Sequence, residues 1–242
     1  MNLKNFELTN IQKDKLIKGI KAAMSIPFID SLEDFIWEGI FCYAKNLSLP
    51  DPMQQIRSKR LFDIVDDANK IGWSAKAVQW SIKQKGEFEL VIQRADIFKK
   101  CVQLGMPNLN IHSDTNDIGK ALRLHWTNKV LTDASIQNVE DKRVCILIKS
   151  VNKKQYAYFE TELDLYDADD LEWKWTDGTK TGLQGIRKED NFCVYRWYPN
   201  QKQFFERFQY DADNHFQFDI TPQRVDVDEL IDWLNSRLKD KP

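Results

Sequence analysis

The stretch that most constrains the fold runs from residue 60 to residue 79, RLFDIVDDANKIGWSAKAVQ, where two apolar runs flank a polar turn. Residues 61–65 alternate and are rich in strand-forming side chains, whereas residues 66–70 have turn chemistry. Residues 71–78 then resume the extended pattern. Two such runs around a short polar turn predict a β-hairpin or a closely spaced pair of strands.

A turn centred on Ala68 and Asn69 sets the register of this hairpin: Ile64 then lies opposite Trp73, and Asp63 lies opposite Ser74. Because side chains alternate along a strand, Lys76 points to the same side as Asp63 and Ser74. A carboxylate, a hydroxyl and an ammonium thus share one face of a sheet that is otherwise built from apolar residues. Burying such groups costs free energy unless they are paired or bind an ion. We therefore take this face as the candidate active site.

The arrangement resembles the PD-(D/E)XK nuclease superfamily, which includes most type II restriction endonucleases. There an acidic residue ends one strand and an acid-x-lysine triplet lies on the next, so Asp63 matches the first acid and Lys76 matches the lysine. Ser74 stands where the second acid usually stands, which is a departure from the pattern and leaves one metal ligand unaccounted for. A glutamate from the preceding helix often reaches the metal site in this superfamily, and Glu38 is the candidate here. Its alternative role is that of a solvated glutamate near Lys45.

The resemblance implies a Mg²⁺-dependent endonuclease that acts on double-stranded DNA as a homodimer, each subunit cutting one strand of a near-palindromic site. Asp63 and Glu38 would hold the Mg²⁺, which keeps several waters. Lys76 would orient or deprotonate the attacking water or stabilise the phosphate, and Ser74 would hold a metal-bound water. Two alternatives stay open: a catalytically inactive DNA-binding module of the same fold, and a repair or defence nuclease without a fixed target.

Other acids and a simpler pairing also fit the pattern. Asp66 and Asp67 are alternative first acids, although strand parity places Asp66 on the other face of the sheet from Lys76 unless a bulge intervenes. Glu89 is either a displaced second acid or, as we favour, an exposed strand glutamate. Asp63 and Lys76 together could also form an ordinary cross-strand salt bridge on a solvent face.

The remaining periodicity predicts a mixed α/β (α+β) fold, in which helices flank a central mixed sheet as in restriction endonucleases and the C-terminal region is β-rich. The expected helices cover residues 8–24, 31–46, 94–103, 113–130 and 226–238, and the expected further strands cover residues 87–93, 143–149 and 156–166. A turn cluster near residue 105 divides the chain into a nuclease core (1–105) and a β-rich target-recognition region (106–242). The C-terminal helix is expected to pack on the core.

Residues 173–210 interleave aromatic side chains with basic and amide side chains that can contact phosphates and base edges. The candidate DNA-binding residues in this stretch are Lys180, Gln184, Arg187, Lys188, Arg196 and Lys202. The alternative is a β-rich subdomain whose aromatics pack together and whose charges face water.

Composition limits these readings. The formal net charge of −2 counts against DNA binding, unless a local basic groove coexists with acidic surface elsewhere. No apolar run approaches the length of a membrane span, and the N-terminus lacks the apolar segment of a secretory signal. The four cysteines form no CxxC pair, which favours reduced thiols in a cytoplasmic protein. The sequence contains no HExxH, GxSxG, P-loop or GxGxxG motif.

Overall fold

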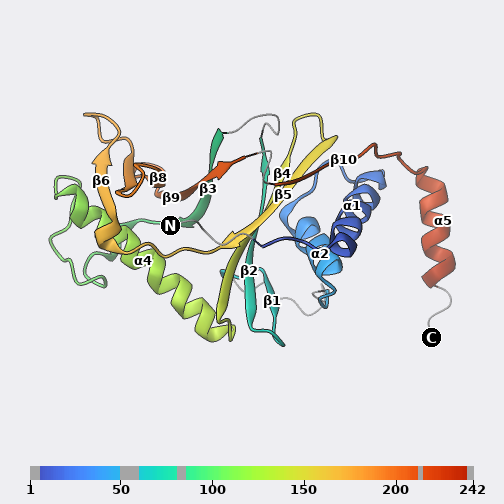
Figure 1. Cartoon of the computed structure of the whole chain (residues 1–242), viewed down its shortest axis with the longest axis horizontal. Coiled ribbons are helices and arrows are strands. Elements are labelled where there is room, and N and C mark those ends of the chain that lie inside the picture. The colour runs from blue at the N-terminus through green and yellow to red at the C-terminus, as the bar shows by residue number, and fades with distance from the viewer. Residues whose placement is uncertain (1–5, 50–59, 81–85, 212–214, 239–242) are drawn as a thin grey trace.

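The computed structural model describes residues 6–49, 60–80, 86–211 and 215–238. In this part of the chain the strands form two five-stranded sheets, which we call sheet A and sheet B (Figure 1). Sheet A has the order β1 (Ile64–Asp66), β2 (Ile71–Gln79), β4 (Asp141–Lys149), β5 (Gln155–Glu162) and β10 (Phe216–Asp219). Sheet B has the order β3 (Gly86–Arg94), β9 (Gln203–Tyr210), β8 (Cys193–Tyr198), β7 (Leu183–Arg187) and β6 (Leu171–Trp175).

Sheet A is mixed and sheet B is antiparallel, so the prediction of a mixed α/β fold is confirmed. The hairpin β1–β2 has the predicted register, with Ile64 opposite Trp73. Strand β2 then pairs in parallel with β4, and the connection between them includes β3, the short helix α3 (Ile97–Lys100) and the long helix α4 (Thr115–Ile136). The pairs β4–β5 and β5–β10 are antiparallel.

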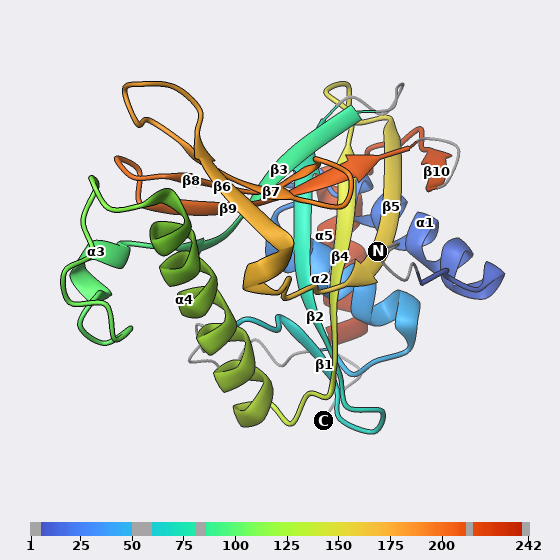
Figure 2. The same ribbon diagram turned by 60° about the vertical axis from the view of Figure 1, so that its left-hand side comes forward.

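The two faces of sheet A pack against different layers. Helices α1 (Asn10–Ser25) and α2 (Asp34–Lys45) cover one face, where Trp37 and Phe41 meet Trp73 and Tyr158 in what we call the helical core. Sheet B and α4 cover the other face and form the inner core with the alternate residues of β4. Figure 2 shows α4 running from sheet B toward the β1–β2 end of sheet A. A sheet buried on both sides explains the continuous apolar run of β4.

The expected boundary at residue 105 does not separate the two sheets. Strand β3, which precedes it, belongs to sheet B, whereas β4, β5 and β10, which follow it, belong to sheet A. The helix expected at residues 94–103 is also shortened to α3. The Ala95 N–H donates to the Lys202 carbonyl and the Trp197 indole donates to the Ala95 carbonyl, so this part of the chain continues along sheet B.

The prediction that the C-terminal helix packs on the core is wrong. No residue of α5 (Val227–Leu238) is buried, and the helix lies beyond α1 and α2, away from both sheets (Figure 1). The segment before it is tied to the loop after α1, because the Val225 N–H donates to the Ser25 carbonyl and Arg224 donates to the Pro27 carbonyl. Both faces of sheet A are already covered, and this attachment directs α5 outward.

Among the described residues, no helix has the length and apolar character needed to cross a membrane. A short 3-10 helix, Ala168–Asp170, precedes β6 and completes the secondary structure of the described ranges.

Candidate functional site

Asp63 and Lys76 come together where β1 begins. The Lys76 Nζ lies 3.8 Å from the Asp63 Oδ2, and the Lys76 and Asp63 side chains are 29% and 27% exposed, respectively. The Asp63 N–H donates to the Trp73 carbonyl at 2.9 Å, and the Ala75 N–H donates to the Asp63 Oδ2 at 2.9 Å. The carboxylate therefore replaces a backbone acceptor at the edge of β2, which fixes its position beside the ammonium.

Helix α4 holds the residues that lead into Asp63. The buried carboxylate of Asp133 accepts a hydrogen bond from the Leu61 N–H at 2.8 Å and another from the Lys129 ammonium at 2.6 Å. The side-chain amide of Gln137 meets both backbone groups of Phe62: its Oε1 accepts the N–H at 3.4 Å and its Nε2 donates to the carbonyl at 2.8 Å. A strand end held on both sides in this way positions the next side chain, Asp63, with little freedom.

Ser74 lies on the inner-core side of sheet A. It is buried, and it lines a cavity of about 10 Å³ together with Lys76, Trp126 and Glu206. Within the described ranges, the Ser74 Oγ, the Trp126 Nε1 and the Glu206 Oε2 each lack a hydrogen-bond partner. A cavity of this volume is close to what one water molecule requires. Ser74 is thus separated from solvent by the inner core.

Glu38 lies on α2, the helix that covers the other face of sheet A. Its charge acts on Cys42: burial, reinforced by the nearby Glu38 carboxylate, raises the pKa of the Cys42 thiol to about 11. The described part of the chain contains no group of three or more His, Cys, Asp or Glu side chains that could hold a metal ion.

The alternative acids have structural partners. Asp66 accepts the N–H groups of Ala68 and Asn69 and so closes the hairpin turn. Glu89 lies in sheet B, where it pairs with Arg196 at 3.3 Å and accepts the Tyr198 hydroxyl at 3.1 Å.

The candidate DNA-binding residues lie in sheet B and its loops, where the charged ones contact other parts of the chain. Lys180 donates to the Ile111 carbonyl, Arg187 pairs with Asp190, Lys188 donates to the Asp169 carbonyl, Arg196 pairs with Glu89, and Lys202 pairs with Asp96. Gln184 lies half-buried in β7. The neighbouring aromatics Trp173, Tyr195 and Trp197 pack into the inner core, as the alternative reading expected.

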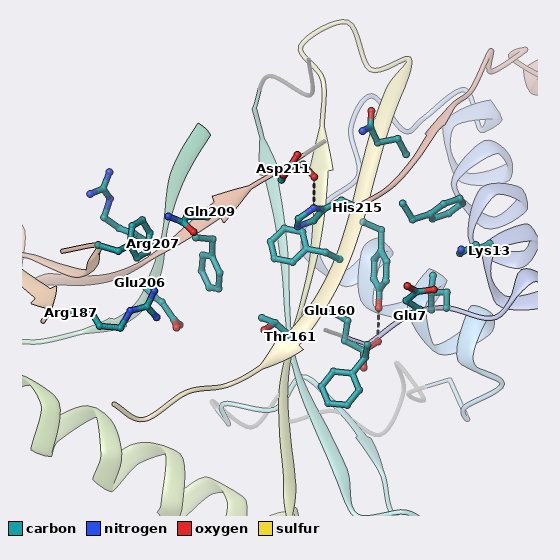
Figure 3. Close-up of a pocket in the computed structure, with 18 of the residues that line it drawn as sticks. Glu7, Lys13, Glu160, Thr161, Arg187, Glu206, Arg207, Gln209, Asp211 and His215 are labelled. Atoms are coloured by element: carbon teal, nitrogen blue, oxygen red, sulfur yellow. Dashed lines mark hydrogen bonds between the residues drawn. The ribbon is translucent and has the colours of Figure 1, made fainter. Parts of the chain in front are cut away.

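Sequence reasoning missed a cavity of about 860 Å³ between the two sheets, lined by the N-terminal segment and by residues of β5, β9 and β10 (Figure 3). Glu206 approaches it from sheet B and Thr161 from sheet A. Glu206 is only 4% exposed, and burial, together with the charge of Asp164, raises its pKa to about 8. The Thr161 hydroxyl, like the Glu206 Oε2, has no partner in the described residues.

Glu160 of β5 also lines this cavity, and its environment is the opposite of that of Glu206. It is fully buried and accepts from Lys45, Arg143, Trp73 and Tyr158 at 2.7–2.8 Å. Burial opposes ionisation, but these cations and donors lower the pKa of Glu160 below its usual value. This acid is therefore ionised and structural, whereas Glu206 keeps its proton near neutral pH.

A sequence signal for Glu206 was present. In the run Phe204 to Phe208, strand parity puts Glu206 on the same face as the two phenylalanines. An acidic residue between two apolar residues on one face of a strand indicates either a buried hydrogen-bond network or a functional site.

Comparison of the chain with protein-family models, with curated proteins and with solved structures finds no match. The functional assignment therefore depends on the geometry of the chain itself.

Proposed function

We propose that this protein is a Mg²⁺-dependent endonuclease that hydrolyses phosphodiester bonds in double-stranded DNA, similar in its active site to type II restriction enzymes. The observation that carries the proposal is the Asp63–Lys76 pair, whose Nζ–Oδ2 distance is 3.8 Å on adjacent strands. Two further features support it: α4 holds the strand end that precedes Asp63, and β2 pairs in parallel with β4 after a helical crossover.

The chemistry follows from the charges of the pair. Negative charge builds up on the phosphate during phosphodiester hydrolysis. The partly exposed Lys76 ammonium, held beside Asp63, would stabilise this charge. Asp63 holds this ammonium in place through the attraction between their charges. The same lysine can also orient the attacking water.

The fit to Mg²⁺ depends mainly on Asp63. Magnesium in proteins is held by one or two carboxylates together with waters and substrate phosphates, so a single positioned carboxylate meets the lower limit. Glu38, which the resemblance suggests as the second ligand, lies on α2 on the other face of sheet A, so it would have to reach the ion around the edge of the sheet. When bound, the ion would polarise the phosphate and increase the acidity of a water.

Target recognition is proposed for sheet B. There Lys180, Lys188, Arg196 and Lys202 would exchange their present partners for phosphates or bases, beside Gln184 and Arg187. Two copies are proposed to act together, each on one strand.

The test compares plasmid and phage DNA cleavage with Mg²⁺ by the parent protein and by Asp63→Asn and Lys76→Met. We expect both variants to lose at least about a hundredfold in rate, because Asp63→Asn removes the charge that would hold the Mg²⁺ ion and Lys76→Met removes the charge that would stabilise the phosphate. DNA binding, followed by mobility shift, should persist. Matched controls are Asp219→Asn in β10 and Lys70→Met in the hairpin turn, both at exposed or partly exposed positions outside the proposed site, and both should cut at the parental rate. Parental cleavage by either site variant would show that the site assignment is wrong.

A second candidate is a catalytically inactive DNA-binding module. Two observations favour it: Ser74 is buried where a second acid would stand, and the described residues form no three-ligand metal group. It predicts mobility shifts without cleavage at any Mg²⁺ concentration. Discrete bands would support a site-specific enzyme, and a smear would support a nuclease without a fixed target.

A further inference from the structure

Helix α5 has an apolar stripe, and none of its residues is buried against the described part of the chain. Val227, Leu230, Ile231, Leu234 and Leu238 recur at helical spacing, and Ile231 and Leu234 are 43% and 44% exposed. An amphipathic helix of twelve residues gains most of its stability from packing its apolar face. The stripe therefore indicates an interface that a single copy of the chain does not complete.

A groove of suitable character lies on the outer surface of the α1–α2 pair. It has a volume of about 560 Å³ and is lined mostly by apolar side chains, with small residues on its floor. Ala22 and Gly39 leave this floor open, and the exposed rings of Phe35 and Tyr43 form its walls with Leu49. Grooves of this kind accept amphipathic helices through anchors at i, i+3, i+4 and i+7.

The charges of the two elements are complementary. Helix α1 carries Lys13, Lys15, Lys18 and Lys21 against a single acid, Asp14, and Lys18 lines the groove itself. Helix α5 carries Asp228, Glu229 and Asp232 against a single base, Arg237. Opposite charges on the rims of an apolar contact favour the pairing of these surfaces and select against like-charged partners.

The helix of the same chain does not lie in this groove. Hydrogen bonds from Val225 to Ser25 and from Arg224 to Pro27 and Asp30 fix its start at the C-terminal end of α1. From that start α5 runs alongside the α1–α2 layer and is set apart from it (Figure 1). Because no residue of α5 is buried, its stripe is accessible to another molecule.

We propose that two copies of this chain exchange their C-terminal helices, so that α5 of each copy lies in the α1–α2 groove of the other. The two contacts are related by a two-fold axis, so the assembly is a closed dimer. It uses residues distant from Asp63 and Lys76, so it does not depend on the proposed nuclease activity.

The test measures oligomeric state by sedimentation velocity and by light scattering across a range of protein concentrations. The parent should be a dimer. Gly39→Glu puts a charge in the groove, at a position where an added Cβ meets nothing within 4 Å among the described residues, so we expect the variant to fold. Leu234→Glu interrupts the stripe on a helix without buried residues. Each variant should raise the dimer dissociation constant at least about tenfold.

The control Ser236→Glu adds the same charge to the opposite face of α5 and should remain dimeric.

Mixing the two variants tests the exchange itself. A Gly39→Glu chain has an intact helix and a Leu234→Glu chain has an intact groove, so their mixture should regain one good contact and associate more tightly than either variant alone. Dimerisation of Gly39→Glu at the parental strength would overturn the proposal, because the helices would then pair with each other. A parent that is monomeric at every concentration would also overturn it, since the stripe would then be covered within one chain.

Discussion

At the scale of single residues, two buried acids that line the same cavity from different sheets show how strongly hydrogen-bond partners determine the pKa. Glu160 has two cations and two neutral donors around its carboxylate, and these lower its pKa despite complete burial. Glu206 has an oxygen without a partner among the described residues, and its burial raises the pKa to about 8. Glu160 therefore stabilises the fold through its ion pairs and hydrogen bonds, whereas Glu206 makes the free energy of unfolding depend on pH.

Glu206→Gln should therefore change how stability depends on pH. Between the ordinary pKa of 4.5 and about 8, the folded protein keeps the Glu206 proton while the unfolded chain loses it. The folded state thus binds more protons, and the free energy of unfolding falls as pH rises through this window. The glutamine has no proton to lose, so the variant should be more stable than the parent by at least about 2 kcal/mol at pH 8.

The measurement is urea denaturation of both proteins at pH 5 and pH 8. At pH 5 the two should have nearly equal stability. A parent and variant whose stabilities fall equally between these pH values would contradict a raised pKa at Glu206.

At the scale of elements, two glycines in the middle of helices have opposite reasons to be there. A Cβ on Gly119 of α4 would lie 2.2 Å from the Trp173 ring, so the bare backbone of α4 is what allows β6 to pack against it. A Cβ on Gly39 of α2 would meet no described atom within 4 Å. Gly119 is required because any side chain there would clash with Trp173. Gly39 has no such packing reason: it lowers the stability of its helix and leaves space in the α1–α2 groove.

Alanine substitutions at these two positions should change stability in opposite directions. Gly119→Ala should lower the free energy of unfolding by at least about 2 kcal/mol, because the added methyl displaces the Trp173 ring. Gly39→Ala should raise it by up to about 1 kcal/mol through helix propensity. Chemical denaturation at a concentration where the protein is monomeric measures both. A neutral Gly119→Ala would show that α4 and β6 are farther apart than described.

At the scale of the whole molecule, one core joins the two sheets. Ile146 and Phe159 of sheet A, Phe204 and Phe208 of sheet B, and Leu122 of α4 belong to the same buried cluster. Each sheet also takes strands from both sides of residue 105. The chain is therefore expected to unfold as one unit.

Thermal and urea unfolding, followed by circular dichroism and by tryptophan fluorescence, should give coincident single transitions. A fragment of residues 1–105 should not fold alone, because β2 would lack its parallel partner β4 and the inner core would be open on one side. Two separated transitions, or a folded fragment, would show that the sheets are independent.

The sequence by itself determined the features that depend on near neighbours along the chain. The alternation of residues 61–78 predicted the hairpin and its register, with Ile64 opposite Trp73, and so brought Asp63 close to Lys76. These features follow from strand parity and turn chemistry within a single stretch, where few arrangements compete.

Only the tertiary structure decided the features that depend on which distant surfaces meet. The burial of Ser74, the unpartnered carboxyl of Glu206, the network around Glu160 and the exposure of α5 all come from segments far apart in the sequence. The physical reason is that desolvation and pairing energies belong to assembled faces: the same amphipathic pattern is compatible with several partners, and packing selects among them.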